Sequence, residues 1–358
     1  MLKKLLRNWI RTRMTNTFIY TKDILFVEVI MKIDSNLVIT YNNLGFQNYS
    51  KGNFDRAIYD FTQAIRIDPN NAITYSNRGV VYSKIKKYDH AIADLTQALR
   101  ITPNDAIAYN NRGIVYYNKK DNDRAILDFT KALKIDQNFA IAYYNRGSAY
   151  FSKGDYDRTI PDYIQTIQIN PNFTNAYNDR CLSCNYKEEY DHAIDDLTQA
   201  IRIDPNFADA FNNRGLMYYN IGDYDLAIAD LTQAIRIDPN FAGAFNNRGL
   251  TYNNKGDYDL AIADLTQAIR IDPNSADAFN NRGLTYNNKA DYDLAITDFD
   301  QAIQLDPNFE NTYRHRAFAY MKKGDYRQAR ADVNKALQIN PNYQSAQELS
   351  DELKQLGY

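Results

Sequence analysis

The sequence predicts an all-α protein built from tandem helix–turn–helix repeats, and three regularities support this fold class. Eight of the nine prolines lie on one ladder with a period of 34 residues. An aromatic residue recurs nine times at a fixed place in that period, and a glycine follows it four residues later in seven of the nine repeats. A fixed period of this length is typical of stacked helix pairs, which bury their apolar faces only against their neighbours.

We number each repeat from 1 to 34 with proline at position 32, so that the first repeat covers residues 38–71. At about 100° per residue, positions 4, 8 and 11 share one face of the first helix, and they hold the aromatic residue, the glycine and usually a tyrosine. A turn such as Lys153–Tyr156 follows, in which Asp155 is expected to cap the second helix. The second helix has alanine at position 20 in eight repeats and ends at a proline such as Pro69, after which Asn70 is expected to cap the next helix.

These positions resemble the tetratricopeptide repeat family over residues 38–343, with nine repeats of an Asn-Arg-Gly variety. The tryptophan and leucine that the family has at positions 4 and 7 are replaced here by tyrosine or phenylalanine and by arginine. The resemblance implies a right-handed superhelical solenoid of antiparallel helix pairs whose first helices line a concave groove. It also implies binding of proteins or peptides, and no stretch of the chain remains for a catalytic domain.

The N-terminal residues 1–19 form a basic leader. Met1–Arg13 contains five basic residues and no acidic one. Three interpretations stay open: a frayed leader, an over-extended start with Met14 or Met31 as the first residue of the protein, and an amphipathic helix that binds a membrane surface. No apolar run in this region approaches the roughly 20 residues of a transmembrane helix.

Three further segments are expected around and within the array. Residues 20–37 align with the second helix of repeat one at the same 34-residue offset, which predicts a degenerate half-repeat whose single helix covers the first full repeat. Residues 344–358 predict a polar C-terminal helix that solvates the last repeat. A hinge is expected near residues 159–184, where Thr159 replaces an alanine and Pro161 falls inside a helix.

The composition argues against a nucleic-acid partner and against a disulfide-dense secreted protein. Lysine and arginine number 42 against 44 acidic residues, so the chain offers no electrostatic reason to bind nucleic acid. Only Cys181 and Cys184 occur, which fits a reducing, cytoplasmic compartment. A Cys-x-x-Cys pair is compatible with thiol redox chemistry or half a metal site, but both residues fall on packing positions, and we expect them to act as small apolar side chains.

A polar ladder is predicted between repeats. Position 7 is arginine in repeats two to nine, and position 23 is aspartate in all nine. Repeat one has Leu44 in place of the arginine, and the preceding half-repeat has Phe26 in place of the aspartate. We therefore expect each aspartate to pair with the arginine of the following repeat, for example Asp60 with Arg78.

Asparagine rows on the opposite face of the first helix are the candidate binding site. An asparagine side chain carries a donor and an acceptor, so a row of them can hold the backbone of an extended peptide. Apolar residues at position 9 lie beside the rows. The candidate residues occupy positions 5 and 6 and are Asn43, Asn77, Asn110, Asn111, Asn145, Asn212, Asn213, Asn246, Asn247, Asn280 and Asn281. The other interpretation is that these asparagines record recent repeat duplication.

The sequence thus predicts a protein-interaction scaffold without enzymatic activity, cofactor or metal site, which binds other proteins or extended peptides in its groove. The alternative function is an adaptor tethered to a membrane surface through residues 1–13.

Overall fold

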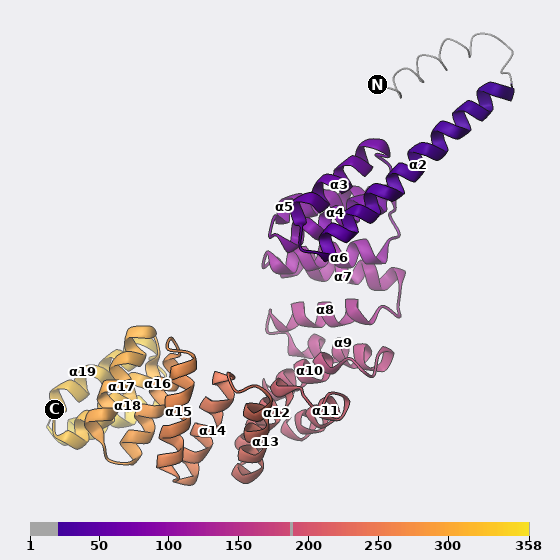
Figure 1. Cartoon of the computed structure of the whole chain (residues 1–358). Coiled ribbons are helices and arrows are strands. Elements are labelled where there is room, and N and C mark those ends of the chain that lie inside the picture. Colours follow the sequence, from indigo (N-terminus) through magenta and orange to yellow (C-terminus); the bar gives the residue numbers. More distant parts are fainter. Residues whose placement is uncertain (1–20, 187–188, 358) are drawn as a thin grey trace. The chain divides into compact units, whose positions relative to one another are not determined.

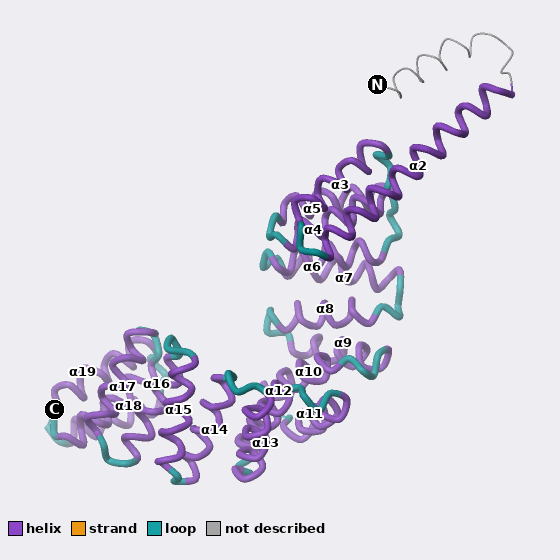
Figure 2. Tube along the Cα trace, viewed as in Figure 1, coloured by secondary structure: helices purple, strands orange, loops and turns teal. Residues whose placement is uncertain are grey.

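The computed structural model describes residues 21–186 and 189–357, with side chains described at 34–184 and 189–357. Within these ranges the chain forms paired helices and no strand, as Figures 1 and 2 show. Contacts divide the chain into two compact units, Met1–Ile169 (unit 1) and Asn170–Tyr358 (unit 2). Among the described helices, none combines the length and the apolar character needed to cross a membrane. The basic leader at 1–19 lies outside the described residues.

Each unit is a series of helix pairs that follow the predicted repeats. The helices of unit 1 are α2 (Thr21–Ser50), α3 (Phe54–Ile67), α4 (Ala72–Lys84), α5 (Tyr88–Ile101), α6 (Ala106–Asn118), α7 (Asn122–Ile135), α8 (Ala140–Phe151) and α9 (Tyr156–Ile169). The helices of unit 2 are α10 (Thr174–Tyr186), α11 (Tyr190–Ile203), α12 (Ala208–Asn220), α13 (Tyr224–Ile237), α14 (Ala242–Lys255), α15 (Tyr258–Ile271), α16 (Ala276–Asn288), α17 (Tyr292–Leu305), α18 (Glu310–Lys323), α19 (Tyr326–Ile339) and α20 (Gln344–Gln355). The predicted all-α architecture of helix pairs is confirmed.

The glycine at repeat position 8 lets the two helices of a repeat pack closely. A Cβ atom at Gly249 of α14 would lie 2.6 Å from Cγ of Leu265 on α15, closer than such atoms approach in proteins. Leu265 stands at position 24, whose apolar side chain is buried in every repeat. Repeat nine tolerates Ala317 instead of glycine, and there the facing side chain is the smaller Val333. The predicted close helix contact at position 8 is therefore confirmed.

The helix caps agree with the sequence in part. Aspartate caps the second helix of some repeats, as Asp121 does by accepting a hydrogen bond from the backbone N–H of Arg124. The expected cap at Asn70 is wrong, because α4 is capped one residue later by Asn71, which accepts from the N–H of Thr74. The backbone N–H of Asn70 instead donates to the side chain of Asp68 at 3.0 Å, which forms a local turn before the helix starts.

The predicted helix at residues 20–37 does not end before repeat one. A single helix, α2, runs from Thr21 to Ser50 and joins this segment to the first helix of the repeat. Figure 1 shows the N-terminal half of α2 projecting beyond α3 and α4 instead of folding back over them. Ser35 stands where eight of the nine repeats have proline, so no proline forces the helix to end there, although α7 ends at Ile135 before Gln137, which also lacks the proline.

The structure describes a helix, α20, within the segment 344–358 and a boundary between units in the middle of the chain. Leu349 and Leu353 of α20 pack against Val333 of α19, while the other face of α20 is polar. The boundary between the two units, at residues 169 and 170, falls inside the region where a hinge is predicted. Helix α9 continues through Pro161. The hinge itself stays a prediction.

Candidate functional site

Unit 1 exposes a row of isoleucines on its first helices. Successive first helices contact one another, so residues at the same repeat position form rows across unit 1. Positions 2, 6, 9 and 13 lie on one face of each helix because they are spaced by four, three and four residues. At position 2, the isoleucines at 39, 73, 107 and 141 are 57%, 68%, 62% and 39% exposed, respectively. We call this face of α2, α4 and α6 the groove of unit 1.

A cavity of about 410 Å³ opens on the same face. Its apolar lining includes Val80 and Ile114 at position 9. Its polar lining includes Asn111 at position 6 together with Lys84 and Lys86. One of the predicted asparagines therefore lines a hollow that combines apolar walls with basic and amide groups.

Most of the predicted asparagines hold neighbouring repeats together. The position-6 amide of one repeat donates to the position-5 oxygen of the repeat before it, as Asn145 does to Asn110 at 3.0 Å. The same bond links Asn213 to Asn178, Asn247 to Asn212 and Asn281 to Asn246. The acceptors Asn110, Asn212 and Asn280 are also buried. Eight of the predicted asparagines thus already form hydrogen bonds within the fold, namely Asn110, Asn145, Asn212, Asn213, Asn246, Asn247, Asn280 and Asn281.

Three of the eleven predicted asparagines keep free side chains. Among the described residues, the amides of Asn43, Asn77 and Asn111 form no hydrogen bond, and all three stand at position 6 of the groove of unit 1, where Asn111 also lines the cavity. For Asn111 the reason lies in the preceding repeat, whose position-5 residue is Ser76, which is too short to repeat the Asn–Asn bond. Before Asn77 the position-5 residue is Asn42, which donates to Thr74, and its buried Oδ1 has no hydrogen-bond partner among the described residues.

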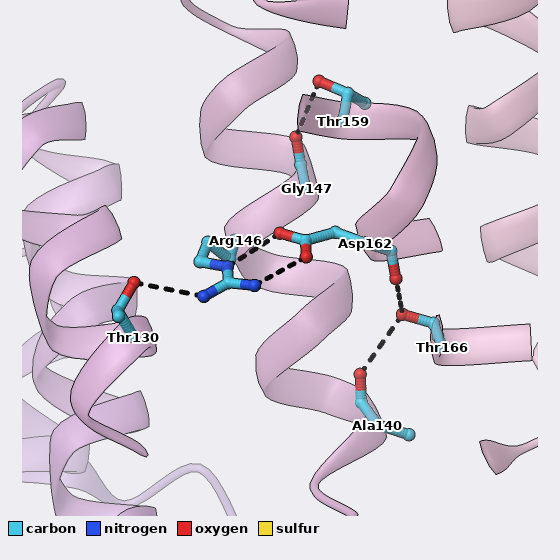
Figure 3. A network of polar contacts seen from close by, with 7 residues as sticks. All are labelled: Thr130, Ala140, Arg146, Gly147, Thr159, Asp162 and Thr166. Atoms are coloured by element: carbon cyan, nitrogen blue, oxygen red, sulfur yellow. Dashed lines mark hydrogen bonds and ion pairs between the residues drawn. The ribbon is translucent and has the colours of Figure 1, made fainter. Parts of the chain in front are cut away.

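The predicted pairing of each aspartate with the following arginine is wrong. Arg146 donates to both carboxylate oxygens of Asp162 in its own repeat, at 2.8 and 2.7 Å, as Figure 3 shows. Its remaining guanidinium nitrogen donates to the hydroxyl of Thr130 in the preceding repeat at 3.2 Å. The arginine therefore joins the second helices of two successive repeats, with the aspartate inside the repeat and a threonine across the interface.

This arrangement recurs along the array. The arginine–aspartate pairs are Arg78–Asp94, Arg112–Asp128, Arg146–Asp162, Arg180–Asp196, Arg214–Asp230, Arg248–Asp264, Arg282–Asp298 and Arg316–Asp332. In six repeats the arginine also donates to the hydroxyl of the threonine at position 25 of the preceding repeat. These arginines are Arg78, Arg112, Arg146, Arg214, Arg248 and Arg282. Asp300 takes this place for Arg316. Burial opposes the charge of Arg146, but the hydrogen bonds and the charge of Asp162 outweigh it and raise the pKa of Arg146.

Repeat one replaces the arginine by a different donor. Leu44 stands at position 7, and the buried Asp60 accepts a hydrogen bond from Asn48 at 2.8 Å. The second carboxylate oxygen of Asp60 has no hydrogen bond among the described residues, and the nearest cation is Arg56, whose Nε lies 3.7 Å away. The two unusual residues of this repeat are thus related: leucine at position 7 removes the usual donor to the aspartate, and asparagine at position 11 supplies another.

The irregular residues in the middle of the chain pack inside the fold. The hydroxyls of Thr159 and Thr166 donate to the backbone carbonyls of Asp155 and Asp162, at 2.8 and 2.9 Å, so replacing alanine leaves no buried hydroxyl without a partner. Figure 3 also marks longer contacts of these hydroxyls with the facing helix. Cys181 and Cys184 are both buried and not disulfide-bonded, and burial raises the pKa of the Cys181 thiol. Both cysteines therefore lie at buried packing positions, as expected from the repeat pattern.

Sequence reasoning missed a second set of contacts between repeats. Lysine at position 14 binds aspartate at position 18 of the preceding repeat, as in Lys119 with Asp89 at 2.6 Å. Further pairs are Lys153–Asp123, Lys255–Asp225, Lys289–Asp259 and Lys323–Asp293. The two types of residue recur 30 positions apart, a signal that the sequence carries. These pairs lie at the surface, so each contributes little to stability.

Histidine replaces the position-6 asparagine in repeat nine. Nδ1 of His315 lies 3.0 Å from Oδ1 of Asn280, which fixes the neutral tautomer that carries its proton on Nδ1. Burial, with a smaller contribution from the charge of Arg314, lowers the pKa of His315 to about 3. The imidazole therefore replaces the asparagine amide as a neutral donor between repeats.

Comparisons with known proteins agree with the repeat architecture. Models described as "Tetratricopeptide repeat" match residues 106–139, 140–173, 208–241, 231–263, 276–309 and 311–343, and a model described as "TPR repeat" matches residues 47–86, 84–120, 183–222 and 249–290. No curated protein matches the chain significantly. Among the described residues, no group of three or more side chains is arranged to bind a metal ion.

Several solved structures share the fold at low sequence identity. A structure titled as the APC/C hetero-tetramer Cut9–Hcn1 is 18% identical over 86% of this chain and 74% of its own, with a TM-score of 0.60. A tetratricopeptide repeat protein from Parabacteroides merdae is 16% identical over 70% of this chain and 98% of its own, with a TM-score of 0.59. PilF from Pseudomonas aeruginosa is 18% identical over 61% of this chain and 98% of its own, with a TM-score of 0.52. Because the family models together match most of its length, this chain belongs to the tetratricopeptide repeat family.

Proposed function

We propose that the protein is a non-enzymatic scaffold that holds an extended segment of a partner protein in the groove of unit 1. The observation that carries this proposal is that Asn43, Asn77 and Asn111 offer free amides in three consecutive repeats, with exposed isoleucines on one side and a cavity on the other. Each amide carries a donor and an acceptor for the backbone of an extended chain. The apolar rows can accept the side chains of the same chain.

The proposal narrows the predicted site from eleven asparagines to three. In unit 2 the amides at positions 5 and 6 already bond to one another, as in Asn247 with Asn212 at 3.0 Å. A peptide that bound there would have to break these bonds, and each broken bond would leave a polar group without its partner at a cost of about 1–3 kcal/mol. In unit 1 no such cost arises at Asn77 or Asn111.

A pull-down with matched variants tests the proposal. The intact chain is compared with the double variant Asn77→Ala, Asn111→Ala and with the control Asn213→Ala, Asn247→Ala, and captured proteins are quantified by mass spectrometry. The first variant should lose partners at an unchanged unfolding temperature, because its amides support no repeat contact. The control should retain partners but unfold at a lower temperature. Partners that survive the first variant would place binding elsewhere on the chain.

A further inference from the structure

The groove of unit 1 differs chemically from the same face of unit 2. Position 2 is isoleucine in all four repeats of unit 1. In unit 2 the position is occupied by polar residues and one glycine, namely Asn175, Asp209, Gly243, Asp277 and Asn311. Exposed apolar side chains in a regular row are unusual on a solvated surface and mark a place where another chain packs. An occupant of the groove of unit 1 must therefore supply aliphatic side chains.

Basic side chains stand at one end of these rows. Lys84 and Lys86 line the cavity, and no acidic residue lines it with them. Among the described residues, neither lysine forms an ion pair. The compositions of the two parts of the chain differ in the same sense: residues 21–169 contain 19 basic and 16 acidic residues, a net charge of +3, whereas residues 170–358 contain 18 basic and 28 acidic residues, a net charge of −10. An occupant with carboxylates would complement this end of the groove.

The backbone at Lys86 is strained, and this strain provides a way to test the lysine separately from the fold. Lys86 has φ = 60°, a left-handed conformation that is unfavourable for a residue with a side chain. Its repeat position 15 is glycine in five other repeats, namely Gly52, Gly154, Gly222, Gly256 and Gly324. Ala290 has the same conformation at this position, with φ = 66°, so the strain itself is not special to Lys86, whose side chain is distinguished by its place in the cavity lining. Lys120 has the same strain, with φ = 65°, but does not line the cavity, and it offers a matched control.

We infer that the groove of unit 1 selects extended segments in which aliphatic side chains are combined with one or two carboxylates. The aliphatic side chains pack on the isoleucine row and on Val80 and Ile114, the backbone bonds to Asn77 and Asn111, and the carboxylates pair with Lys84 and Lys86. This inference rests on the proposed function of the same groove and adds the chemical class of the ligand.

Selection from an unbiased peptide library tests the inference. Phage displaying random dodecapeptides are selected on the immobilised full-length protein, and the enriched peptides are synthesised with a fluorescent label for anisotropy titrations. The expected peptides combine Val, Ile or Leu with Asp or Glu. The double variant Lys84→Glu, Lys86→Glu should bind them about fivefold to tenfold more weakly, and the difference should shrink as salt is raised. Peptides in which Lys replaces the acidic residues should bind that variant better than they bind the intact protein.

Single glycine substitutions separate binding from stability. Lys86→Gly should raise the unfolding midpoint, because it relieves the strained backbone, and should weaken binding of the acidic peptides. Lys120→Gly should raise the midpoint similarly and leave binding unchanged. Enriched peptides that are neutral or basic, or equal binding by both glycine variants, would overturn the inference while the groove still binds peptide. If instead no enriched peptide depends on Asn77 and Asn111, the proposed function of the groove fails as well.

Discussion

Removing the arginine of repeat seven tests the pairing inside repeats. Arg248 donates to both oxygens of Asp264 at 2.6 and 2.8 Å and to the hydroxyl of Thr232 at 2.9 Å. Asp264 is only 8% exposed, so Arg248→Met would leave a buried carboxylate without its cation. Loss of a partner in a buried pair costs about 3–5 kcal/mol, and the loss of the threonine bond adds about 1 kcal/mol. Because the arginine side chain is itself 16% exposed, we expect a total near the lower end of this sum, about 4 kcal/mol.

Double-mutant cycles distinguish the two pairings. Urea unfolding of the single and double variants is fitted with a nearest-neighbour model, because repeat arrays depart from two-state behaviour. The coupling of Arg248→Met with Asp264→Asn should be about 2 kcal/mol, and its coupling with Thr232→Val about 0.5–1 kcal/mol. The coupling with Asp230→Asn, in the preceding repeat, should stay below about 0.5 kcal/mol. A strong coupling to Asp230 and a weak one to Asp264 would refute pairing inside the repeat.

Three further substitutions follow from the same geometry. Leu44→Arg should stabilise unit 1 by about 1 kcal/mol in urea unfolding, because its guanidinium would supply a hydrogen bond to the Asp60 oxygen that Arg56 approaches only to 3.7 Å, and an unchanged or lower midpoint would contradict this. Gly249→Ala should destabilise by about 1–2 kcal/mol despite the helix preference of alanine, because its Cβ would collide with the position-24 leucine, and thermal unfolding measures the loss. His315→Asn should remove an acid sensitivity. The histidine pKa is lowered to about 3 on folding, so its contribution to stability is complete above the unfolded pKa near 6.5 and declines as pH falls towards 3, by about 1–2 kcal/mol at pH 5. Equal pH profiles for the protein and this variant would reject the effect.

The sequence predicted rows of residues better than bonds between them. The 34-residue period and the helical 100° arithmetic give the faces on which position 7 and position 23 lie. They do not say which aspartate an arginine reaches, since one lies on the second helix of its own repeat and another on the preceding one. That choice depends on side-chain directions that emerge only when the helices pack. The pairing was therefore predicted wrongly, although the residues were identified correctly.

Single residues of the sequence carried a signal for the continuous helix α2 and for the asparagines without hydrogen bonds. Ser35 lacks the proline that ends the second helix in most repeats, and the helix runs on through it. Ser76 lacks the amide that occupies Asn145 one interface later, and Asn111 stays free. Both signals are departures from the repeat pattern, which a search for the shared pattern passes over. The strained Lys86 is a third departure of this kind.

A last prediction follows from the departure at Ser76: restoring asparagine at this position should stabilise the array and weaken peptide binding in the groove of unit 1. In Ser76→Asn, the new amide oxygen would stand where Asn110 stands one repeat later, and it should accept a hydrogen bond from Asn111 as Asn110 does from Asn145. One added bond between repeats should stabilise unit 1 by about 0.5–1.5 kcal/mol. The same bond would occupy an amide that the groove uses for peptide, so affinity for the selected peptides should fall. Equilibrium unfolding and anisotropy titration on the same samples measure both effects. If the variant becomes more stable while its affinity is unchanged, the amide of Asn111 takes no part in binding, and the groove would have to act through its apolar and basic side chains alone.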